Sequence, residues 1–285
     1  MRRGLLVAMS IFLMLFCIAL PAAAESKQKG LLITPPRQYL MVDPGKTTKS
    51  SITIANLTEN TRDVVLSVEQ FSVADYTYAY TFDLPKENWV KLEQTQATLK
   101  KNESRTIAYT VAAPANAAPG GHYFSLFAST SLGEGRQVRA ATVLYVTAAG
   151  TVSKQSAIAR HAIPPISFGG DIPYDMDVKN TGNTHFIAYA SGVMRGLLPF
   201  SLPLASEVAH IVLPATTRTI EGKMSPPLLP GLYWAVVGYR DEDGHEIRRT
   251  QYSFYMPPWF LVFIAGAAWF SVLMYKRIRK RPTGS

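Results

Sequence analysis

The chain has 285 residues, of which 47% are hydrophobic, and its formal net charge is +9. Arg2 and Arg3 contribute +2 and the basic tail, residues 276–285, contributes +5, which leaves only +2 for residues 25–275. Positive charge that gathers at the two ends of a chain is typical of membrane topology rather than of nucleic-acid binding, so we expect no nucleic-acid partner.

Residues 1–24 have the features of a secretory signal. Two arginines precede an uncharged, apolar run at residues 4–20, which a proline and three alanines follow. Small residues after such a run are typical of a signal-peptidase site, so we predict cleavage after Ala24. An uncleaved N-terminal anchor is the alternative.

The single cysteine, Cys17, lies inside this signal, and the bulky Phe16 before it argues against a lipid-modified cysteine. The mature chain then contains no cysteine. It must be stabilised by burial without disulfides, and it offers neither a thiol nucleophile nor a cysteine ligand for a metal.

Residues 25–149 are predicted to form a first β-sandwich. Apolar and polar residues alternate over short runs separated by turn residues, which is typical of antiparallel strands with one buried face. The runs lie at residues 51–55, 64–69, 107–111, 123–128 and 138–146. Pro-Gly turns follow Asp43 and Ala118 and separate strands of this kind.

The segment DYTYAYTF is the most unusual part of this region. If it forms a strand, four aromatic side chains share one face: Tyr76, Tyr78, Tyr80 and Phe82. Trp89 follows shortly after. These five residues are candidates for binding a sugar ring or a protein partner. The alternative, in which the stripe packs inside the sandwich or against a second domain, is favoured because aromatic residues in strands are usually buried.

Residues 150–256 are predicted to form a second β-sandwich of the same kind. Its strands are expected at residues 174–178, 186–193, 211–213, 218–224, 232–239 and 247–254. The two halves resemble each other: VKNTGNTHFIAYASG from Val178 is similar to IANLTENTRDVVLSV from Ile54. RTIEGKMSPPLLPGLY from Arg218 is likewise similar to RTIAYTVAAPANAAPGGHY from Arg105. We therefore predict a duplicated immunoglobulin-like sandwich.

Residues 257–275 are predicted to form a transmembrane helix. The stretch from Trp259 to Tyr275 has no charged residue, and about 20 apolar residues cross a bilayer. The two aromatic residues mark the membrane interfaces, and Lys276 and Arg277 open the basic tail. The positive-inside rule places this tail in the cytoplasm and residues 25–256 outside the cytoplasmic membrane, where they are extracellular or face the cell wall.

No motif for catalysis, metal binding or cofactor binding is found in the sequence. The five histidines are scattered without ligand spacing: His122, His161, His185, His210 and His245. The acidic stretch DEDG at residues 241–244 lacks the further ligands of a calcium loop and is predicted to be a hairpin turn. We therefore expect no catalytic residues, no metal site and no cofactor.

Three segments resemble the WxL-interacting proteins of Gram-positive bacteria. They are VDPGKTTKSSITIANLTENTRDVVLSV, LKKNESRTIAYTVAAPANAAPGGHYFSLFAS and the ending MPPWFLVFIAGAAWFSVLMYKRIRKR. The resemblance covers the first sandwich and the anchor well and the second sandwich loosely. It implies a peptidoglycan-binding immunoglobulin-like domain, a second sandwich for surface contacts and a C-terminal transmembrane anchor.

The sequence thus predicts an all-β fold of two tandem immunoglobulin-like β-sandwiches plus one C-terminal transmembrane helix. The first functional hypothesis is a non-enzymatic, membrane-anchored surface protein for adhesion or scaffolding, with cell-wall peptidoglycan or surface proteins as partners. A pilus-type assembly chaperone that acts by β-strand donation is the second hypothesis. The third is an envelope hydrolase, which needs two carboxylates or a metal site in a cleft.

Overall fold

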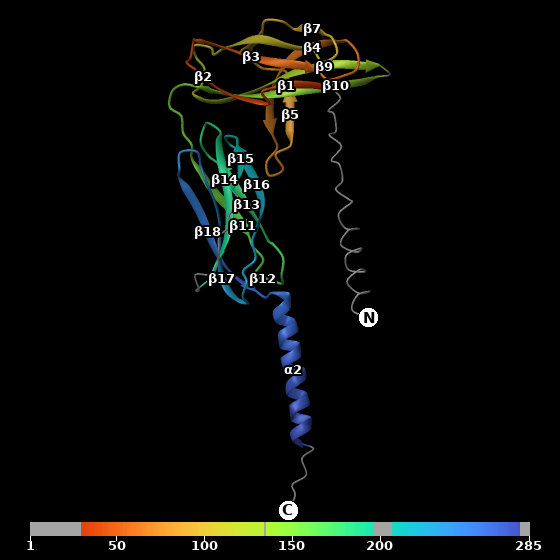
Figure 1. The fold of residues 1–285 in the computed structure, drawn as a ribbon. Coiled ribbons are helices and arrows are strands. Elements are labelled where there is room, and N and C mark those ends of the chain that lie inside the picture. Colours follow the sequence, from red (N-terminus) through yellow and green to blue (C-terminus); the bar gives the residue numbers. More distant parts are fainter. Residues whose placement is uncertain (1–29, 134, 197–206, 280–285) are drawn as a thin grey trace, which may run out of the picture.

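The computed structural model describes residues 30–133, 135–196 and 207–279 (Figure 1). The predicted signal with its cleavage site lies outside these residues, and so do the last six residues of the basic tail. The described fold consists of β-strands with immunoglobulin-like packing and one helix at the C-terminal end, which confirms the predicted fold class.

The first sandwich consists of two sheets that pack face to face. One sheet has the strand order β1 (Leu31–Thr34), β3 (Thr47–Asn56), β8 (Ser104–Ala112) and β6 (Val90–Leu92). The other, here called the β10 sheet, has the order β2 (Arg37–Val42), β10 (Arg136–Ala148), β9 (Gly120–Gly133), β4 (Arg62–Val73) and β5 (Tyr80–Asp83), and β7 (Gln96–Leu99) also pairs with β4.

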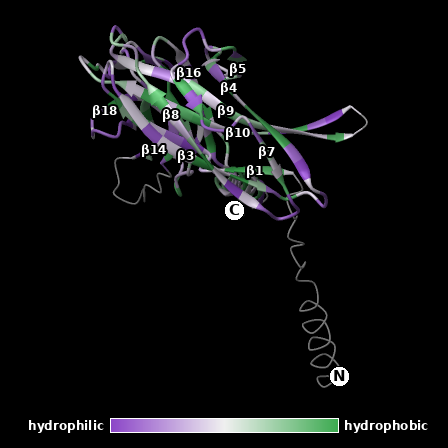
Figure 2. Ribbon diagram, turned by 90° about the horizontal axis from the view of Figure 1, so that it is seen from above, coloured by the Kyte–Doolittle hydropathy of each residue, from purple (hydrophilic) through white to green (hydrophobic). Residues whose placement is uncertain are grey.

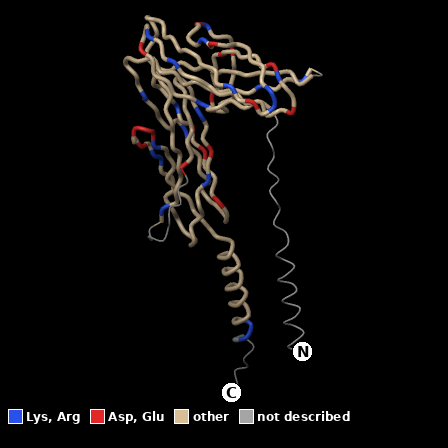
Figure 3. Tube along the Cα trace, turned by 45° about the horizontal axis from the view of Figure 1, so that its top comes forward, with Lys and Arg blue, Asp and Glu red and all other residues tan. Residues whose placement is uncertain are grey.

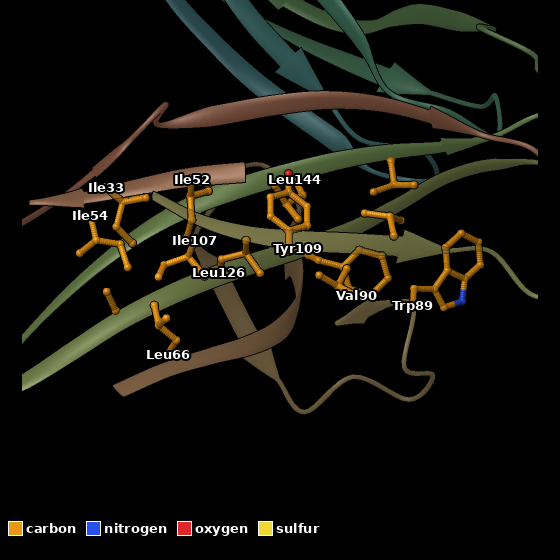
Figure 4. Close-up of a cluster of buried hydrophobic side chains, with 14 of the residues drawn as sticks. Ile33, Ile52, Ile54, Leu66, Trp89, Val90, Ile107, Tyr109, Leu126 and Leu144 are labelled. Carbon is orange, nitrogen blue, oxygen red and sulfur yellow. The ribbon is translucent and has the colours of Figure 1, made fainter. Parts of the chain in front are cut away.

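Alternate side chains of both sheets meet in one hydrophobic core (Figure 4). Ile54, Ile107, Leu126 and Leu144 are each at most 1% exposed. Each large apolar side chain that is fully buried stabilises the fold by roughly 1.5–3 kcal/mol. A core of this kind can hold the sandwich together without a disulfide.

The second sandwich repeats this arrangement. One sheet has the order β11 (Ser156–Ala162), β13 (Ile172–Asn180) and β16 (Thr217–Met224). The other, here called the β18 sheet, has the order β12 (Ile166–Ser167), β18 (Glu246–Tyr255), β17 (Gly231–Arg240), β14 (Phe186–Arg195) and β15 (Val208–Val212). A second core lies between these sheets and includes Met176, Phe186, Ile220 and Tyr239.

The two sandwiches share one strand topology. The strands β1, β2, β3, β4, β7, β8, β9 and β10 have the same partners as β11, β12, β13, β14, β15, β16, β17 and β18. In both, the last strand pairs antiparallel with the strand before it and parallel with the second strand of its sandwich. Among the described strands, β5 and β6 are the ones without a counterpart. This agrees with the internal sequence similarity.

Two asparagines at equivalent places show the same duplication in atomic detail. Asn56 ends β3 and Asn180 ends β13, and both are fully buried. Each donates its side-chain amide to the carbonyl four residues later, in Asn60 (2.9 Å) or Thr184 (2.8 Å). Each also donates at 3.0 Å to a carbonyl of the adjoining edge strand, β7 or β15. One amide therefore connects a turn to both sheets of its sandwich.

Helix α2 (Pro258–Arg279) follows β18 almost directly and projects from the far end of the second sandwich (Figure 1). Residues 258–277 are long enough and on average apolar enough to cross a membrane, and the most apolar 18-residue stretch within them is not buried in the described structure. The helix continues four residues beyond the predicted end, into the basic tail. Lysine and arginine favour this extension because they are good helix formers and complement the helix dipole at its C-terminus.

Candidate functional site

Five neighbouring strands each place one aromatic side chain in a single row across the outer face of the β10 sheet. This aromatic row consists of Tyr39 in β2, Tyr145 in β10, Tyr123 in β9, Phe71 in β4 and Phe82 in β5. Neighbouring ring centroids in the row lie 5.1–6.4 Å apart. The row faces outward because side chains alternate along a strand, and neighbours such as Leu40, Phe124 and Leu144 pack in the first core.

The second sandwich covers the middle of the aromatic row. Ile211 and Leu213 pack on Tyr123 and Tyr145 in a third hydrophobic cluster, which lies between the two cores. His185 also enters this junction, and its ring lies 5.0 Å from that of Tyr145. Burial lowers the pKa of His185 to about 4, with Lys154 adding to the shift and Glu242 opposing it. The imidazole is therefore neutral at pH 7.

The loop between β4 and β5 locks the two sandwiches together. Tyr76 pairs through its backbone with β16, donating its N–H to Thr217 at 2.6 Å. The Tyr78 hydroxyl accepts a hydrogen bond from the N–H of Leu213 at 2.6 Å, and the Arg218 guanidinium lies over its ring at 4.5 Å. Burial raises the pKa of Tyr78. Both tyrosines therefore belong to the junction.

The prediction that Tyr76, Tyr78, Tyr80 and Phe82 share one face of a single strand is wrong. Strand β5 begins only at Tyr80, and Tyr76 and Tyr78 have φ angles of 65° and 57°, which no strand has. Pairing with the second sandwich overrides the local alternation. Of the four, Tyr80 and Phe82 do share a strand face, where their rings stack with centroids 6.0 Å apart.

Trp89 is 2% exposed and packs in the first core. Its ring stacks on His122 at 4.0 Å, and its indole N–H donates to the Glu87 carboxylate at 2.7 Å. It lines a cavity of about 170 Å³ together with Gln70 and Lys86. Trp89 therefore stabilises the sandwich and does not extend the aromatic surface of Tyr80 and Phe82.

The acidic residues on the outer face of β13 are held in ion pairs. Arg160 contacts Asp175 at 2.5 Å and Asp177 at 2.7 Å. Burial alone raises the pKa of Asp177, but hydrogen bonds from Arg160 and Thr219 outweigh it, and the net pKa is lowered. A carboxyl group that stays ionised is unsuited to act as a general acid, as a hydrolase requires.

The DEDG segment forms the hairpin turn between β17 and β18. The Asp241 carboxylate accepts hydrogen bonds from the N–H groups of Asp243 (3.0 Å) and His245 (2.8 Å). Asp241, Asp243 and His245 lie close enough together to hold a metal ion, but Asp243 and His245 are exposed. Because the turn itself uses the buried carboxylate of Asp241, the cluster has a structural explanation.

One half of β10 has no neighbour on its outer side. Strand β2 pairs with β10 only from Val143 onward, so residues 137–142, here called the β10 edge, have β9 on one side and no strand on the other among the described residues. The Val143 N–H donates to Pro36 at 3.2 Å on the β2 side. Since backbone groups alternate in direction along a strand, those of Arg139 and Ala141 point to this open side.

The β10 edge also carries small apolar side chains. Val138 and Ala140 are half-buried, and Ala140 packs against the first core. Arg139 points to the outer face of the sheet, where it forms an ion pair with Glu69. Its guanidinium carbon lies 3.4 Å from the centroid of the Phe127 ring. Figure 2 shows the hairpin of β9 and β10 reaching beyond the rest of the sandwich. Residues 30–35 run close by, since the Thr142 hydroxyl donates to Pro35 at 2.6 Å, but they form no strand pairing with the edge. The edge is therefore unpaired among the described strands and apolar on its inner side.

The equivalent edge of the second sandwich is different in character. Strand β12 pairs only with the last two residues of β18, which leaves residues 246–253 beside no strand on that side in the described part of the chain. Three exposed charged residues lie along this stretch: Glu246, Arg248 and Arg249. Charged side chains on an edge strand oppose pairing with another chain. The β10 edge is consequently the more receptive of the two.

The residues predicted to mark the membrane interfaces lie near the two ends of α2. Trp259 is the second residue of the helix and is 50% exposed. Tyr275 is 64% exposed and lies one turn before the end, with Lys276 and Arg277 beside it. The four residues thus lie on one continuous helix, and their place at membrane interfaces stays a prediction.

Comparison with known proteins gives similarity in fold only. No family model and no curated protein matches the chain. A solved structure of the class 5 fimbriae chaperone CfaA is 9% identical, with a TM-score of 0.45 over 80% of this chain and 99% of that one. The CupB2 chaperone of Pseudomonas aeruginosa is 12% identical, with a TM-score of 0.39 over 78% and 99%.

The CsuC–CsuE chaperone–tip adhesion subunit complex of Acinetobacter baumannii is 13% identical, with a TM-score of 0.38 over 80% of this chain and 98% of that one. At such identities and TM-scores the likeness assigns neither a family nor a function to this chain. The candidate site is therefore interpreted from its own geometry.

Proposed function

We propose that this chain is a membrane-anchored binding protein that captures an extended segment of a partner protein at the β10 edge, in the manner of an assembly chaperone. The observation that carries the proposal is the open side of residues 137–142 beside an apolar margin of the first core. Addition of a strand to a sheet edge is a recurrent way to recognise extended peptides.

The energetics of such binding follow from the edge. Each backbone hydrogen bond contributes a net free energy of about 0.5–1.5 kcal/mol, so two or three of them give affinity without sequence preference. Specificity then depends on the side chains of the partner that point toward Val138 and Ala140. Because both residues are small, the site favours a partner segment with large apolar side chains at alternate positions.

Membrane anchoring by α2 belongs to the same proposal. The uncharged part of the helix, from Pro258 to Tyr275, extends over about 27 Å, which is close to the hydrocarbon core of a bilayer at about 30 Å. Side chains such as Phe263, Ile264 and Trp269 are 46–67% exposed in the described chain, and lipid covers such surface favourably. Lys276 and Arg277 then lie on the cytoplasmic side, and both sandwiches lie outside.

The proposal is tested by site-specific photo-crosslinking in native membranes. A photoreactive amino acid replaces Arg139 in the full chain, and we expect it to crosslink a protein partner. The variant Ala141→Pro removes one N–H on the open side without breaking a bond to β9, and we expect it to reduce crosslinking at least several-fold.

Thr250→Pro is the matched control, because the N–H of Thr250 likewise points to the unpaired side of β18. It should leave crosslinking from position 139 unchanged. A second variant carries the photoreactive amino acid at position 250. Equal crosslinking from positions 139 and 250, or crosslinking from position 139 that persists in Ala141→Pro, would rule out capture by strand pairing at this edge.

A second candidate function is binding of cell-wall glycan through Tyr80 and Phe82. Their stacked rings are 50% and 36% exposed, and exposed aromatic rings can pack on sugars. This candidate accords with the resemblance to the WxL-interacting proteins, which itself remains a prediction. If this candidate is correct, purified peptidoglycan should retain the full chain. Tyr80→Ala should abolish this retention, whereas Ala141→Pro should leave it unchanged.

A further inference from the structure

The end of the second sandwich from which α2 leaves carries an unusual number of exposed apolar side chains. They come from the segment that contains β12 and from the connection between β16 and β17, including the start of β17. Ile166 and Phe168 are 53% and 64% exposed, and Leu228, Leu229 and Leu232 are 74%, 40% and 59% exposed. We call these five residues the apolar rim.

Sheet register places the apolar rim beside the start of α2. Gly231, next to Leu232, pairs with Tyr255 at the end of β18. On the other side, the N–H of Met256 donates to Ser167 at 2.9 Å, between Ile166 and Phe168. A Cβ added to Gly169 would lie 2.7 Å from the Pro258 ring, so this connection touches the first residue of the helix.

Three of the segments that meet at this end contain no charged residue, and the nearest charges are those of Asp171, Arg195 and Lys223 in neighbouring strands or at their ends. Residues 162–170, 224–239 and 250–275 lack Asp, Glu, Lys and Arg entirely. In Figure 3 no charged residue is marked from the end of β18 to the last part of α2. Charged groups are costly to move into lipid, so their absence from all three segments at this level is what contact with a bilayer requires.

The outer face of the β18 sheet adds aromatic residues just above the apolar rim. Trp234 and Tyr252 pair across β17 and β18, with ring centroids 6.2 Å apart, and Tyr252 is 61% exposed. Tryptophan and tyrosine favour the level of the lipid headgroups, where an apolar ring and a polar group are both accommodated. The exposed Arg195 pairs with Trp234 from β14, and further charges follow three and four residues beyond Tyr252, at Arg249 and Arg248.

Chain length limits how far this end can lie from the bilayer. Only Met256 and Pro257 separate Tyr255 from the first residue of α2, and an extended residue spans at most about 3.6 Å. If α2 crosses the membrane, the apolar rim is held within about 10 Å of it. A lipid surface is therefore the partner that the rim meets first.

We propose that the apolar rim is a membrane-docking surface that inserts into the lipid headgroup region and holds the second sandwich against the bilayer. The inference depends on the proposed anchoring by α2 but not on capture at the β10 edge. It implies that the sandwiches do not swing freely on the helix. The β10 edge is then presented at a fixed height above the membrane, because the loop of Tyr76 and Tyr78 joins the two sandwiches.

The test uses spin labels on the full chain in phospholipid nanodiscs. Single cysteines are introduced at Phe168 and Leu228 in a Cys17→Ser background, and the collision rates of each nitroxide with oxygen and with a water-soluble nickel complex are compared. Oxygen concentrates in lipid, whereas the nickel complex stays in water. We expect the ratio of oxygen to nickel collisions at both positions to exceed that at Leu84 several-fold.

Leu84→Cys is the matched control, since Leu84 is 84% exposed in the first sandwich. Ile264→Cys reports on the helix itself. A lipid-like ratio at position 264 with water-like ratios at 168 and 228 overturns the docking surface while leaving the anchor intact. A water-like ratio at position 264 overturns both, and neither result bears on crosslinking from position 139.

Discussion

Asn56 and Asn180 each satisfy backbone groups that would otherwise be buried without a partner. The side-chain oxygen of each also accepts an N–H two residues later, at 3.0 Å from Thr58 and 2.9 Å from Gly182. A buried polar group without a partner costs about 1–3 kcal/mol. These two positions therefore stabilise the sandwiches more than any surface hydrogen bond of similar length.

The variant Asn180→Ala should lower the free energy of unfolding of the second sandwich by about 3 kcal/mol, because two buried carbonyl groups lose the amide donor and the Gly182 N–H loses one of its two acceptors. Urea denaturation of the full chain in detergent measures the change. Asn88→Ala, at an exposed position of the first sandwich, should stay within about 0.5 kcal/mol of the parent. Equal effects of the two variants would contradict this account.

His185 makes the junction between the sandwiches sensitive to acid. Its pKa falls from 6.5 to about 4 in the folded chain, so between these values the unfolded chain binds a proton that the folded chain does not. The free energy of unfolding should therefore decrease as the pH falls through this window, by at most roughly 3 kcal/mol.

Urea titrations at pH 7 and pH 4.5 of the parent and of His185→Gln measure this contribution. The variant should lose part of the acid sensitivity. If its stability changes with pH as steeply as that of the parent, His185 is not the responsible group.

At the scale of elements, the loop between β4 and β5 decides how the sandwiches are joined. It has no counterpart among the described strands of the second sandwich, and its backbone continues the sheet of β16 through Tyr76. Around it, Phe71 and Tyr123 pack against Leu213. An insertion in one of two duplicated sandwiches has thus become the contact between them.

The variant Tyr78→Phe should weaken this junction by about 1–3 kcal/mol, since the buried N–H of Leu213 loses its acceptor. Hydrogen exchange at the amide of Leu213 measures the effect, and we expect faster exchange. Tyr76→Phe is the matched control, because Tyr76 pairs through its backbone and its side chain is 56% exposed. Unchanged protection of Leu213 in Tyr78→Phe would refute the assignment.

At the scale of the whole molecule, the described chain has an unpaired strand edge in the first sandwich, a packed junction between the two sandwiches and an apolar helix after the second sandwich. In the proposed arrangement, the β9–β10 hairpin lies at the end away from the membrane (Figure 1). A tethered binding protein benefits from such an order, because its site is then presented beyond the lipid surface.

Protease protection tests the proposed topology. Protease added to cells with an accessible envelope should degrade residues 30–256, while an epitope placed after Ser285 stays protected until the membrane is broken. The reason is the positive-inside rule acting on Lys276 and Arg277. An epitope that is cleaved in intact cells would invert the topology and place the β10 edge in the cytoplasm.

The strands with strong alternation were predictable from the sequence alone. Strands β3, β8, β13 and β16 lie where apolar and polar residues alternate, which is a local consequence of the backbone period of a strand. Helix α2 lies, up to Tyr275, where charge is absent. The short edge strands β1, β2, β11 and β12 were missed. They carry weak patterns and form only because a neighbouring strand offers hydrogen bonds.

The candidate site depended on the tertiary structure. Tyr39, Tyr123 and Tyr145 come from three distant parts of the chain, and only the register between strands reveals that they form one row. The open side of Ala141 is likewise a property of where β2 ends. The sequence by itself thus determined which segments bury a face or suit a membrane, whereas pairing between distant segments decided which edge and which aromatic face stay open.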